Sequence, residues 1–228
     1  MSIFERTSQL IGEHNIEKLN NSHVAVFGVG GVGGHTVEFL VRTGVGEVTI
    51  VDFDTVSESN INRQIIALHS TVGKLKVDVF KDRLLDINPN LKINVFPIKF
   101  CGESIHQIFS KNFDYVVDAI DDVSNKVLLI QTCKEKNIPI VSAMGAGNRC
   151  DIPNFQVEDI FKTYNDGLAK VMRKRLRDVG IDKHTVVFTK SISKPAGNVV
   201  GSIAYYPSMC GCVLSAYVIN QLIGEDLW

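Results

Sequence analysis

A cluster of glycines carries the first chemical signal of this sequence. Gly28, Gly30 and Gly33 have the G-x-G-x-x-G spacing, between an apolar run at residues 24–27 and a segment with apolar residues at helical spacing. At a strand-to-helix turn these glycines permit a tight bend, close approach of the backbone to a phosphate, and packing of helix on strand. The free N–H groups of the helix then face an anion. The spacing predicts a phosphate-binding turn, although glycine-rich turns without a ligand share it.

An acidic residue ends the next predicted strand, residues 47–52. Asp52 follows the glycines at about the distance along the chain where nucleotide-binding units place a carboxylate on the ribose hydroxyls. Gly44 and Gly46 close the helix between the two strands. Strand, turn, helix, strand and acid form a complete βαβ unit, which predicts nucleotide binding.

Polar residues directly after this acid argue against a nicotinamide dehydrogenase, the default interpretation of such a unit. Asn60, Arg63 and Gln64 are spaced to share one face of a short helix, and Lys76 follows in an amphipathic helix predicted for residues 73–87. Arg63 and Lys76 can both reach the phosphates of a nucleotide on the glycine turn. Two cations suit a triphosphate better than a dinucleotide bridge. Taken alone, Lys76 is equally well explained as a solvated helix lysine.

Carboxylates also follow the apolar strand predicted for residues 114–119. Asp118 and Asp121 lie where ligands bind in open α/β sheets, at the carboxyl end of a parallel strand. Mg²⁺ is usually held by one or two carboxylates together with phosphate oxygens, so both residues are candidates. Asp122 can instead simply cap the next helix, predicted for residues 123–136.

Composition places these motifs in one large α/β domain. The chain has 228 residues, 45% of them hydrophobic and 21% charged, with a net charge of −1. Five cysteines lack paired Cys-x-x-Cys spacing, which favours a reducing compartment. Cys210 and Cys212 are better explained as structural than as reactive or zinc-binding. We expect a cytoplasmic protein that does not span a membrane, because no apolar run reaches the ~20 residues required.

Together these motifs resemble the ubiquitin-activating-enzyme-like (ThiF/MoeB-type) adenylyltransferase superfamily over residues 1–150. The matching residues are Gly28, Gly30, Gly31, Gly33, Asp52, Asp54, Asn60, Arg63, Gln64, Lys76, Asp118 and Asp121. The resemblance implies a Rossmann-like, mainly parallel sheet flanked by helices, with a C-terminal extension of mixed strands and helices. It implies that this whole set binds ATP, with Asp52 on the ribose and Asn60, Arg63 and Lys76 on the phosphates. Asp121 would bind Mg²⁺.

The same resemblance gives a role to Arg6, which periodicity alone would leave on the surface. The superfamily places an N-terminal arginine in the nucleotide site of the partner subunit, so Arg6 is expected to act in trans in a homodimer. Arg63, Lys76, Asp121 and Arg6 are then the expected catalytic residues.

The last third of the chain resembles the bacterial branch of the tRNA threonylcarbamoyladenosine dehydratases. The similar segments are residues 145–151, 159–181 and 201–208. We therefore expect a single domain over residues 1–228, with an ATP-binding half (1–150) and a substrate and dimer half (151–228). Gly167, Ile152 and Lys194 depart from the pattern, and these departures affect the expected substrate contacts.

Five cations cluster on one predicted helix of the substrate half: Lys170, Arg173, Lys174, Arg175 and Arg177. A charge run of this kind is usually a solvated helix face. In a chain of near-zero net charge, however, local positive density suits the phosphates of tRNA, which such a patch would position without reading sequence.

The resulting hypothesis is ATP-dependent dehydration of N6-threonylcarbamoyladenosine in tRNA, through adenylation or phosphorylation of its carboxylate. The alternative is an adenylyltransferase that activates the C-terminus of a ubiquitin-like sulfur-carrier protein. A nucleotide-binding regulator and a dehydrogenase are further alternatives. The resemblance also leaves open sulfur-relay protein partners and a monovalent cation, Na⁺ or K⁺, beside residues 151–163.

Overall fold

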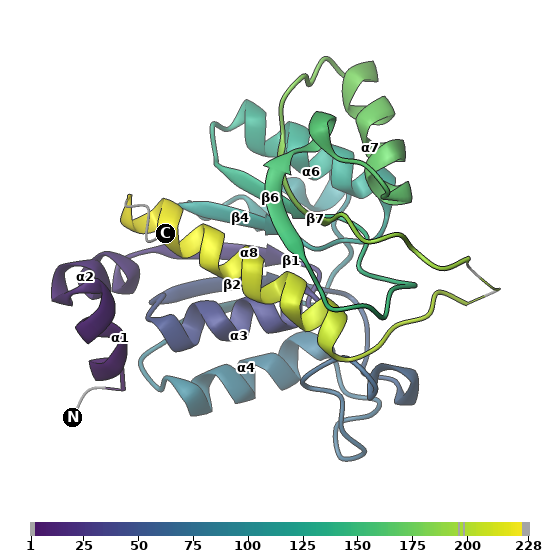
Figure 1. The fold of residues 1–228 in the computed structure, drawn as a ribbon. Helices are drawn as coiled ribbons and strands as arrows, with labels where there is room; N and C mark the ends of the chain where they lie inside the picture. Colours follow the sequence, from purple (N-terminus) through teal and green to yellow (C-terminus); the bar gives the residue numbers. More distant parts are fainter. Residues whose placement is uncertain (1–2, 196, 198, 225–228) are drawn as a thin grey trace.

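The fold is built on one seven-stranded sheet with strand order β3-β2-β1-β4-β5-β7-β6 (Figure 1). The computed structural model describes residues 3–195, 197 and 199–224. The strands are β1 (His23–Phe27), β2 (Glu47–Val51), β3 (Lys92–Phe96), β4 (Tyr115–Asp118), β5 (Ile140–Ala143), β6 (Phe155–Asp159) and β7 (Thr185–Thr189). All neighbours pair in parallel except β6, which is antiparallel to β7 at the sheet edge. The predicted Rossmann-like class is confirmed.

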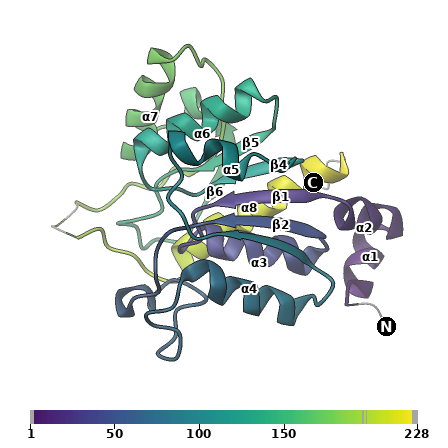
Figure 2. The same cartoon turned by 180° about the vertical axis from the view of Figure 1, so that it is seen from behind.

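Helices cover both faces of the sheet. One face carries α3 (Gly33–Thr43), α4 (Lys76–Ile87) and α8 (Tyr205–Ile223), and the other carries α5 (Ile105–Ile108) and α6 (Val123–Glu135) (Figures 1 and 2). α7 (Gly167–Asp178) packs on α6. α1 (Glu5–Ile11) and α2 (Glu13–Asn20) lie beside the amino ends of β1 and β2.

Buried strand residues supply the core on both faces. Every residue of β1 is buried, as expected of a parallel strand covered on both sides. Its side chains alternate between the faces: Val24 and Val26 join the cluster under α3 and α8, whereas Ala25 and Phe27 join the cluster on the opposite face. This alternation fixes the register in which β1 pairs with β2 and β4, so the carboxyl ends of these parallel strands lie at the same edge of the sheet.

The C-terminal helix α8 belongs to this core, because it is apolar nearly all round. It begins at Tyr205 and crosses the face formed by β4, β5, β7 and β6. Gly211 permits its close contact with α3, because a Cβ there would lie 2.6 Å from the Val32 carbonyl oxygen. Within the described residues, no helix is both long and apolar enough to cross a membrane.

The strands of the last third belong to the same sheet, in which β7 lies between β5 and β6. Two other parts of the fold differ from the expectations. α4 begins at Lys76 rather than residue 73, because Gly73 adopts a φ of +87° in the preceding turn. The short helix expected to carry Asn60, Arg63 and Gln64 is not formed: Glu58–Asn60 is a single 3₁₀ turn, and residues 61–64 do not continue it as a helix.

Candidate active site

A cleft of about 630 Å³ opens at the carboxyl ends of β1, β2 and β4. This is where open α/β sheets bind ligands, because the loops after adjacent strands diverge there. Ten of the predicted site residues line it: Gly28, Gly30, Gly31, Asp52, Asp54, Asn60, Arg63, Gln64, Lys76 and Asp121. The sequence motifs are therefore brought together in one place.

The glycines of the turn have two different roles. Gly28 has a φ of +82°, and a Cβ there would lie 2.7 Å from the Ala119 carbonyl oxygen. A Cβ at Gly33 would lie 1.9 Å from the carbonyl oxygen of Gly28. Gly30 is different, since the nearest atom to its Cβ position is Gln64 Nε2 at 3.7 Å. Gly28 and Gly33 are thus required by packing, whereas Gly30 leaves its side of the turn free for a ligand.

Asp52 and Lys76 are held by short contacts around Asp54. The two oxygens of Asp52 accept the N–H groups of Val29 and Asp54, each at 2.9 Å. Lys76 Nζ lies 2.7 Å from Asp54 Oδ2 and is nearly buried. Burial raises the pKa of Asp52, and the positive charge of Lys76 opposes that rise. The cluster thus places one ammonium and two carboxylates on the cleft wall.

The residues after the 3₁₀ turn form the next side of the cleft. Asn60 Oδ1 accepts the N–H of Ser57 at 3.1 Å, and Arg63 donates to the Ser59 carbonyl at 2.8 Å. Gln64 is 7% exposed, and its Oε1 has no hydrogen-bond partner among the described residues. An unsatisfied buried acceptor is costly, so its place in the cleft wall indicates a donor supplied by a ligand.

The two predicted carboxylates after β4 lie in different environments. Asp121 is exposed and lines the cleft. Asp118 is fully buried outside it, where Oδ1 lies 3.0 Å from Lys126 Nζ and Oδ2 accepts the Ser142 hydroxyl at 2.6 Å. The structure thus differs from the expectation that Asp118 contacts the nucleotide. Asp122 accepts the N–H of Asn125 at 2.8 Å and caps α6, as the simpler interpretation predicts.

An apolar side of the cleft was missed by the sequence analysis. Phe27, Val51, Ile98, Phe100 and Ile120 line it together with Phe53, whose ring lies 6.0 Å from Lys99 Nζ. Ile98 and Phe100 follow β3 at its carboxyl end, and their alternation with Lys99 was the available signal. Such a wall suits the flat, weakly polar face of a nucleobase.

The loop after β5 and the segment before α8 supply another wall that was not predicted. The loop after β5 contributes Ala146 and Gly147, and the segment before α8 contributes Val200, Ser202 and Pro207. Asn148 joins the two segments through paired hydrogen bonds with Gly201. These contacts link residues far apart in sequence, so no local pattern marks them.

The predicted basic helix corresponds to α7. Ala169, Met172 and Leu176 are buried on one side, while most of the cations lie on the other. Two of the five cations contact the protein itself: Arg173 donates to the Thr163 carbonyl at 3.0 Å, and the Arg177 guanidinium lies 4.9 Å from the centre of the Phe161 ring. The remaining three, Lys170, Lys174 and Arg175, are exposed.

Arg6 does not lie near the cleft of its own chain. It is an exposed residue of α1, and this helix packs at the end of the sheet opposite the cleft (Figure 1). Cys210 is buried within α8, and burial raises the pKa of its thiol to about 12. The structural interpretation of Cys210 follows from this placement.

The chain has the features of a nucleotide-binding protein: a Rossmann-like sheet, and one cleft that contains a glycine turn, an acid positioned to bind ribose, and cations. The model described as "ThiF family" matches residues 4–227, and the chain belongs to this family. The resemblance given by the motifs is thereby confirmed.

Similar proteins share almost the whole length of the chain. The tRNA threonylcarbamoyladenosine dehydratase of Bacillus subtilis (strain 168) is 39% identical over 241 residues, which cover 97% of this chain and 95% of that protein. The Escherichia coli (strain K12) protein of that name is 39% identical over 183 residues, covering 80% of this chain and 68% of its own. Crystal structures of E. coli tRNA N6-threonylcarbamoyladenosine dehydratase, TcdA, with AMP and with ATP each match with a TM-score of 0.91 and 33% identity. Both matches cover 97% of this chain, with 94% of the AMP-bound chain and 93% of the ATP-bound chain.

Proposed function

We propose that the chain is an ATP-dependent dehydratase that removes water from N6-threonylcarbamoyladenosine in tRNA by activating its carboxylate. The proposal rests on the cleft, where the glycine turn, the acid expected to bind ribose (Asp52) and two cations (Arg63 and Lys76) lie together. A dehydratase relative that matches this chain over nearly its whole length supports it. Because the proposed substrate is tRNA, we also propose that the protein acts in the cytoplasm.

The cleft residues fit ATP. Asp52 retains acceptor capacity for the ribose hydroxyls beyond its two backbone bonds. The unpartnered Gln64 Oε1 is available to a ligand donor. Arg63 and Lys76 line the same cleft as Gly30 and bring two positive charges to it, and Asn60 adds an amide. Gly31 completes the turn, and Asp54 holds Lys76 in place.

Asp121 fits a magnesium ion. Its exposed carboxylate is a hard oxygen ligand facing the cleft, and no group of three or more His, Cys, Asp or Glu side chains in the described ranges could form a metal cage. Mg²⁺ bound by one carboxylate together with phosphate oxygens is the usual arrangement for such a site. When bound, the ion would neutralise charge on the phosphates. A monovalent cation beside residues 151–163 stays a prediction.

The chemistry follows from the poor reactivity of a carboxylate, whose leaving group would be oxide. The threonyl carboxylate attacks the α-phosphate of ATP, an O–P bond forms, and pyrophosphate leaves. Arg63 and Lys76 offset the negative charge that develops. The carbamoyl group of the same nucleoside then attacks the activated carbonyl, AMP leaves with the carboxylate oxygen, and a ring closes. Attack on the γ-phosphate would release ADP instead. Intramolecular attack explains why no transfer cysteine is required.

The tRNA is expected to contact α7, where Lys170, Lys174 and Arg175 are exposed. Their amphipathic helix buries its apolar side on α6, so its cations are presented from a fixed scaffold. Arg173 and Arg177 support this surface through their contacts with Thr163 and Phe161. Phosphate contacts of this kind would position tRNA without reading its sequence.

Arg6 is proposed to act in the cleft of a second copy. Its helix lies at the far end of the sheet from its own cleft, so only a partner subunit can bring it to a nucleotide (Figure 1). A homodimer follows from this role. Sulfur-relay proteins as further partners stay a prediction.

The test is to incubate the protein with ATP, Mg²⁺ and tRNA that carries threonylcarbamoyladenosine, and to examine the digested nucleosides by mass spectrometry. We expect an ATP-dependent loss of one water, AMP as the second product, and loss of turnover in an Asp121→Ala variant that still folds. An unchanged nucleoside with nucleotide binding intact would refute the dehydratase. The sulfur-carrier activity would then be tested with a small protein ending in Gly-Gly.

A further inference from the structure

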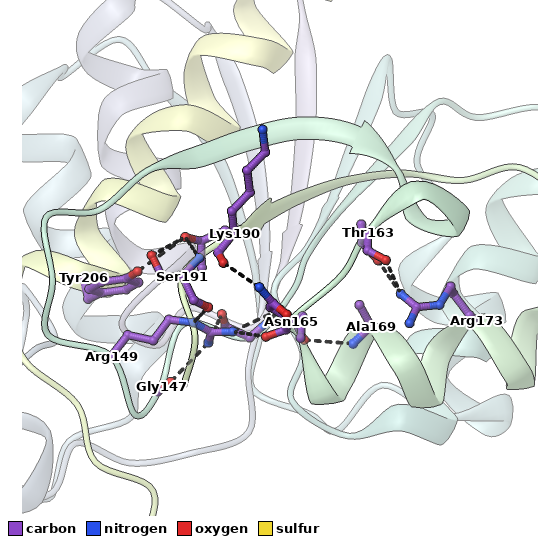
Figure 3. Close-up of polar contacts among 12 residues, drawn as sticks. Gly147, Arg149, Thr163, Asn165, Ala169, Arg173, Lys190, Ser191 and Tyr206 are labelled. Atoms are coloured by element: carbon purple, nitrogen blue, oxygen red, sulfur yellow. Dashed lines mark hydrogen bonds and ion pairs between the residues drawn. The ribbon is translucent and has the colours of Figure 1, made fainter. Parts of the chain in front are cut away.

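Arg149 lies at the centre of a buried polar cluster beside the cleft (Figure 3). It is 5% exposed, and its guanidinium donates to backbone carbonyls rather than to a ligand surface. Nη1 donates to Gly145 at 2.7 Å and Gly147 at 3.2 Å, Nη2 to Asn165 at 3.2 Å, and Nε to Ser191 at 3.1 Å. One side chain therefore binds four carbonyls from three separate segments of the chain.

The charge of Arg149 is balanced inside the same cluster. Asp166 is 4% exposed, and its Oδ2 lies 3.8 Å from Arg149 Nη2. That oxygen accepts the N–H of Gly145, and Oδ1 accepts the N–H of Ala169, both at 2.9 Å. Asp166 is thus the N-cap of the basic helix α7 and also an anchor of the loop after β5. The start of α7 and the cleft wall share one set of contacts.

The three segments joined by Arg149 all border the cleft or the basic helix. The loop after β5 supplies Ala146 and Gly147 to the cleft wall, and the segment after Ser191 supplies Val200 and Ser202. The remaining segment, which contains Asn165, leads directly into α7. None of these segments contains a residue assigned above to the ATP phosphates or ribose.

We propose that Arg149 is a positioning residue that fixes the substrate-facing wall of the cleft relative to α7. It acts through the main chain of three loops and does not itself touch ATP. Its loss is expected to impair use of the tRNA nucleoside while leaving nucleotide affinity largely unchanged. The tRNA part of this inference rests on the proposed function.

The geometry explains why arginine is needed. A guanidinium offers five N–H donors in a rigid plane, which matches carbonyls that approach from several directions. A lysine in the same place keeps the charge opposite Asp166 but offers one ammonium centre. Arg149→Lys therefore tests the donor geometry separately from the charge, and Arg149→Met removes both.

The experiment compares these two variants with the wild type in three measurements. Nucleotide affinity is measured with ATP by calorimetry, kcat and KM are measured with modified tRNA, and hydrogen exchange is followed by mass spectrometry. For Arg149→Met we expect ATP affinity within about twofold, and kcat/KM for tRNA lower by about tenfold or more, since small misplacements of bound groups cost up to ~10²-fold. Exchange should increase in residues 145–149, 163–167 and 190–195. For Arg149→Lys we expect kcat/KM and exchange rates between those of the wild type and those of Arg149→Met.

A matched control separates positioning from general loss of stability. Leu84→Ala removes a fully buried side chain two turns after Lys76 in α4, toward the end of the helix that is away from the cleft, and should leave kcat/KM for tRNA unchanged at temperatures where the protein is folded. The proposal is overturned if Arg149→Met weakens ATP binding as much as tRNA turnover, or if the three segments exchange no faster. If the wild type fails to dehydrate tRNA, the dehydratase function fails, while calorimetry and exchange still decide whether Arg149 orders these loops.

Discussion

Replacement of Lys126 by methionine is expected to destabilise the fold strongly, because Lys126 is fully buried and pairs with a buried carboxylate. Lys126 and Asp118 are both fully buried, and Lys126 Nζ lies 3.0 Å from Asp118 Oδ1. Nζ also donates to the Ile120 carbonyl at 3.0 Å. On the other side, Ser142 donates to Asp118 and lies 2.8 Å from His184 Nε2. The variant would leave this carboxylate buried with one hydroxyl and one backbone N–H as donors.

The magnitude follows from the cost of an unpaired buried charge. Removal of one partner of a buried ion pair costs about 3–5 kcal/mol, because the remaining ion keeps its desolvation penalty. Burial already raises the pKa of Asp118, with Lys126 opposing that rise. Replacement of both partners, as in Lys126→Met with Asp118→Asn, removes the uncompensated charge. We therefore expect the double variant to be more stable than Lys126→Met alone.

Urea unfolding at pH 7, followed by circular dichroism, measures these free energies of unfolding. The reasoning is refuted if Lys126→Met lies within about 1 kcal/mol of the wild type, which is typical of an ordinary surface substitution. It is also refuted if the double variant shows no recovery. Because Lys126 binds the carbonyl next to Asp121, calorimetry of the folded Lys126→Met variant should also show weaker Mg²⁺-dependent ATP binding.

Three further predictions address the turn, the pH response and the partner subunit. Gly33→Ala should unfold at clearly lower urea, since its Cβ would lie 1.9 Å from a carbonyl oxygen, whereas Gly30→Ala should keep the wild-type midpoint but bind ATP more weakly; equal midpoints for the two variants would contradict this. Burial lowers the pKa of His184 to about 3, so the folded state stays neutral while the unfolded state takes up a proton below about pH 6.5. Stability is therefore lost as pH falls, by about 2 kcal/mol per site between pH 7.5 and pH 5. Urea unfolding at both pH values should show a loss that is smaller by about 2 kcal/mol in His184→Gln than in the wild type, because His23 and His35, whose pKa values burial also lowers, still contribute in the variant. Equal losses would exclude His184 as a cause. Mixing Arg6→Ala with Asp121→Ala subunits should restore about a quarter of wild-type turnover, because half the dimers are mixed and each has one intact site. Turnover no higher than that of either variant alone would argue against action in trans.

The nucleotide-binding unit was predictable because its determinants are local. The strand before Gly28, the glycine spacing and the acid at the end of the next strand all lie within one βαβ unit. The strand predicted for residues 114–119 then indicated Asp121, and the family resemblance added Asp54. The same reasoning wrongly placed Asp118 in the nucleotide site. It is the last residue of β4, and its side chain points to the α6 face, where Lys126 is buried. Helical spacing places Lys126 with Val123, Val127 and Ile130, a signal that could have identified it as an inward-facing lysine.

The remaining parts of the site depend on tertiary contacts. The alternation of Ile98, Lys99 and Phe100 indicates an apolar side there, but not that this side faces the cleft. Arg149 sits in a loop with no helical or strand period, and its four acceptors are distributed between residues 145 and 191. The apolar wall at Ile98 and Phe100 depends on the return of the chain after β3 to the cleft edge. Such contacts are fixed by sheet order, which the sequence pattern did not specify.

Sheet order also bears on whether the two halves of the chain form separate domains. β7 pairs with β5, and β6 pairs with β7, so the strands after residue 150 extend the sheet of the first half. α8 packs across β4 and β5 as well as β6 and β7, and it contacts α3 closely at Gly211. Residues 1–150 alone would leave the edge of β5 unpaired and the apolar surface under α8 uncovered. They would also lack the cleft wall formed by Val200, Ser202 and Pro207. The two halves are therefore expected to fold as one cooperative unit, in which the second half supplies part of the substrate-facing wall of the cleft.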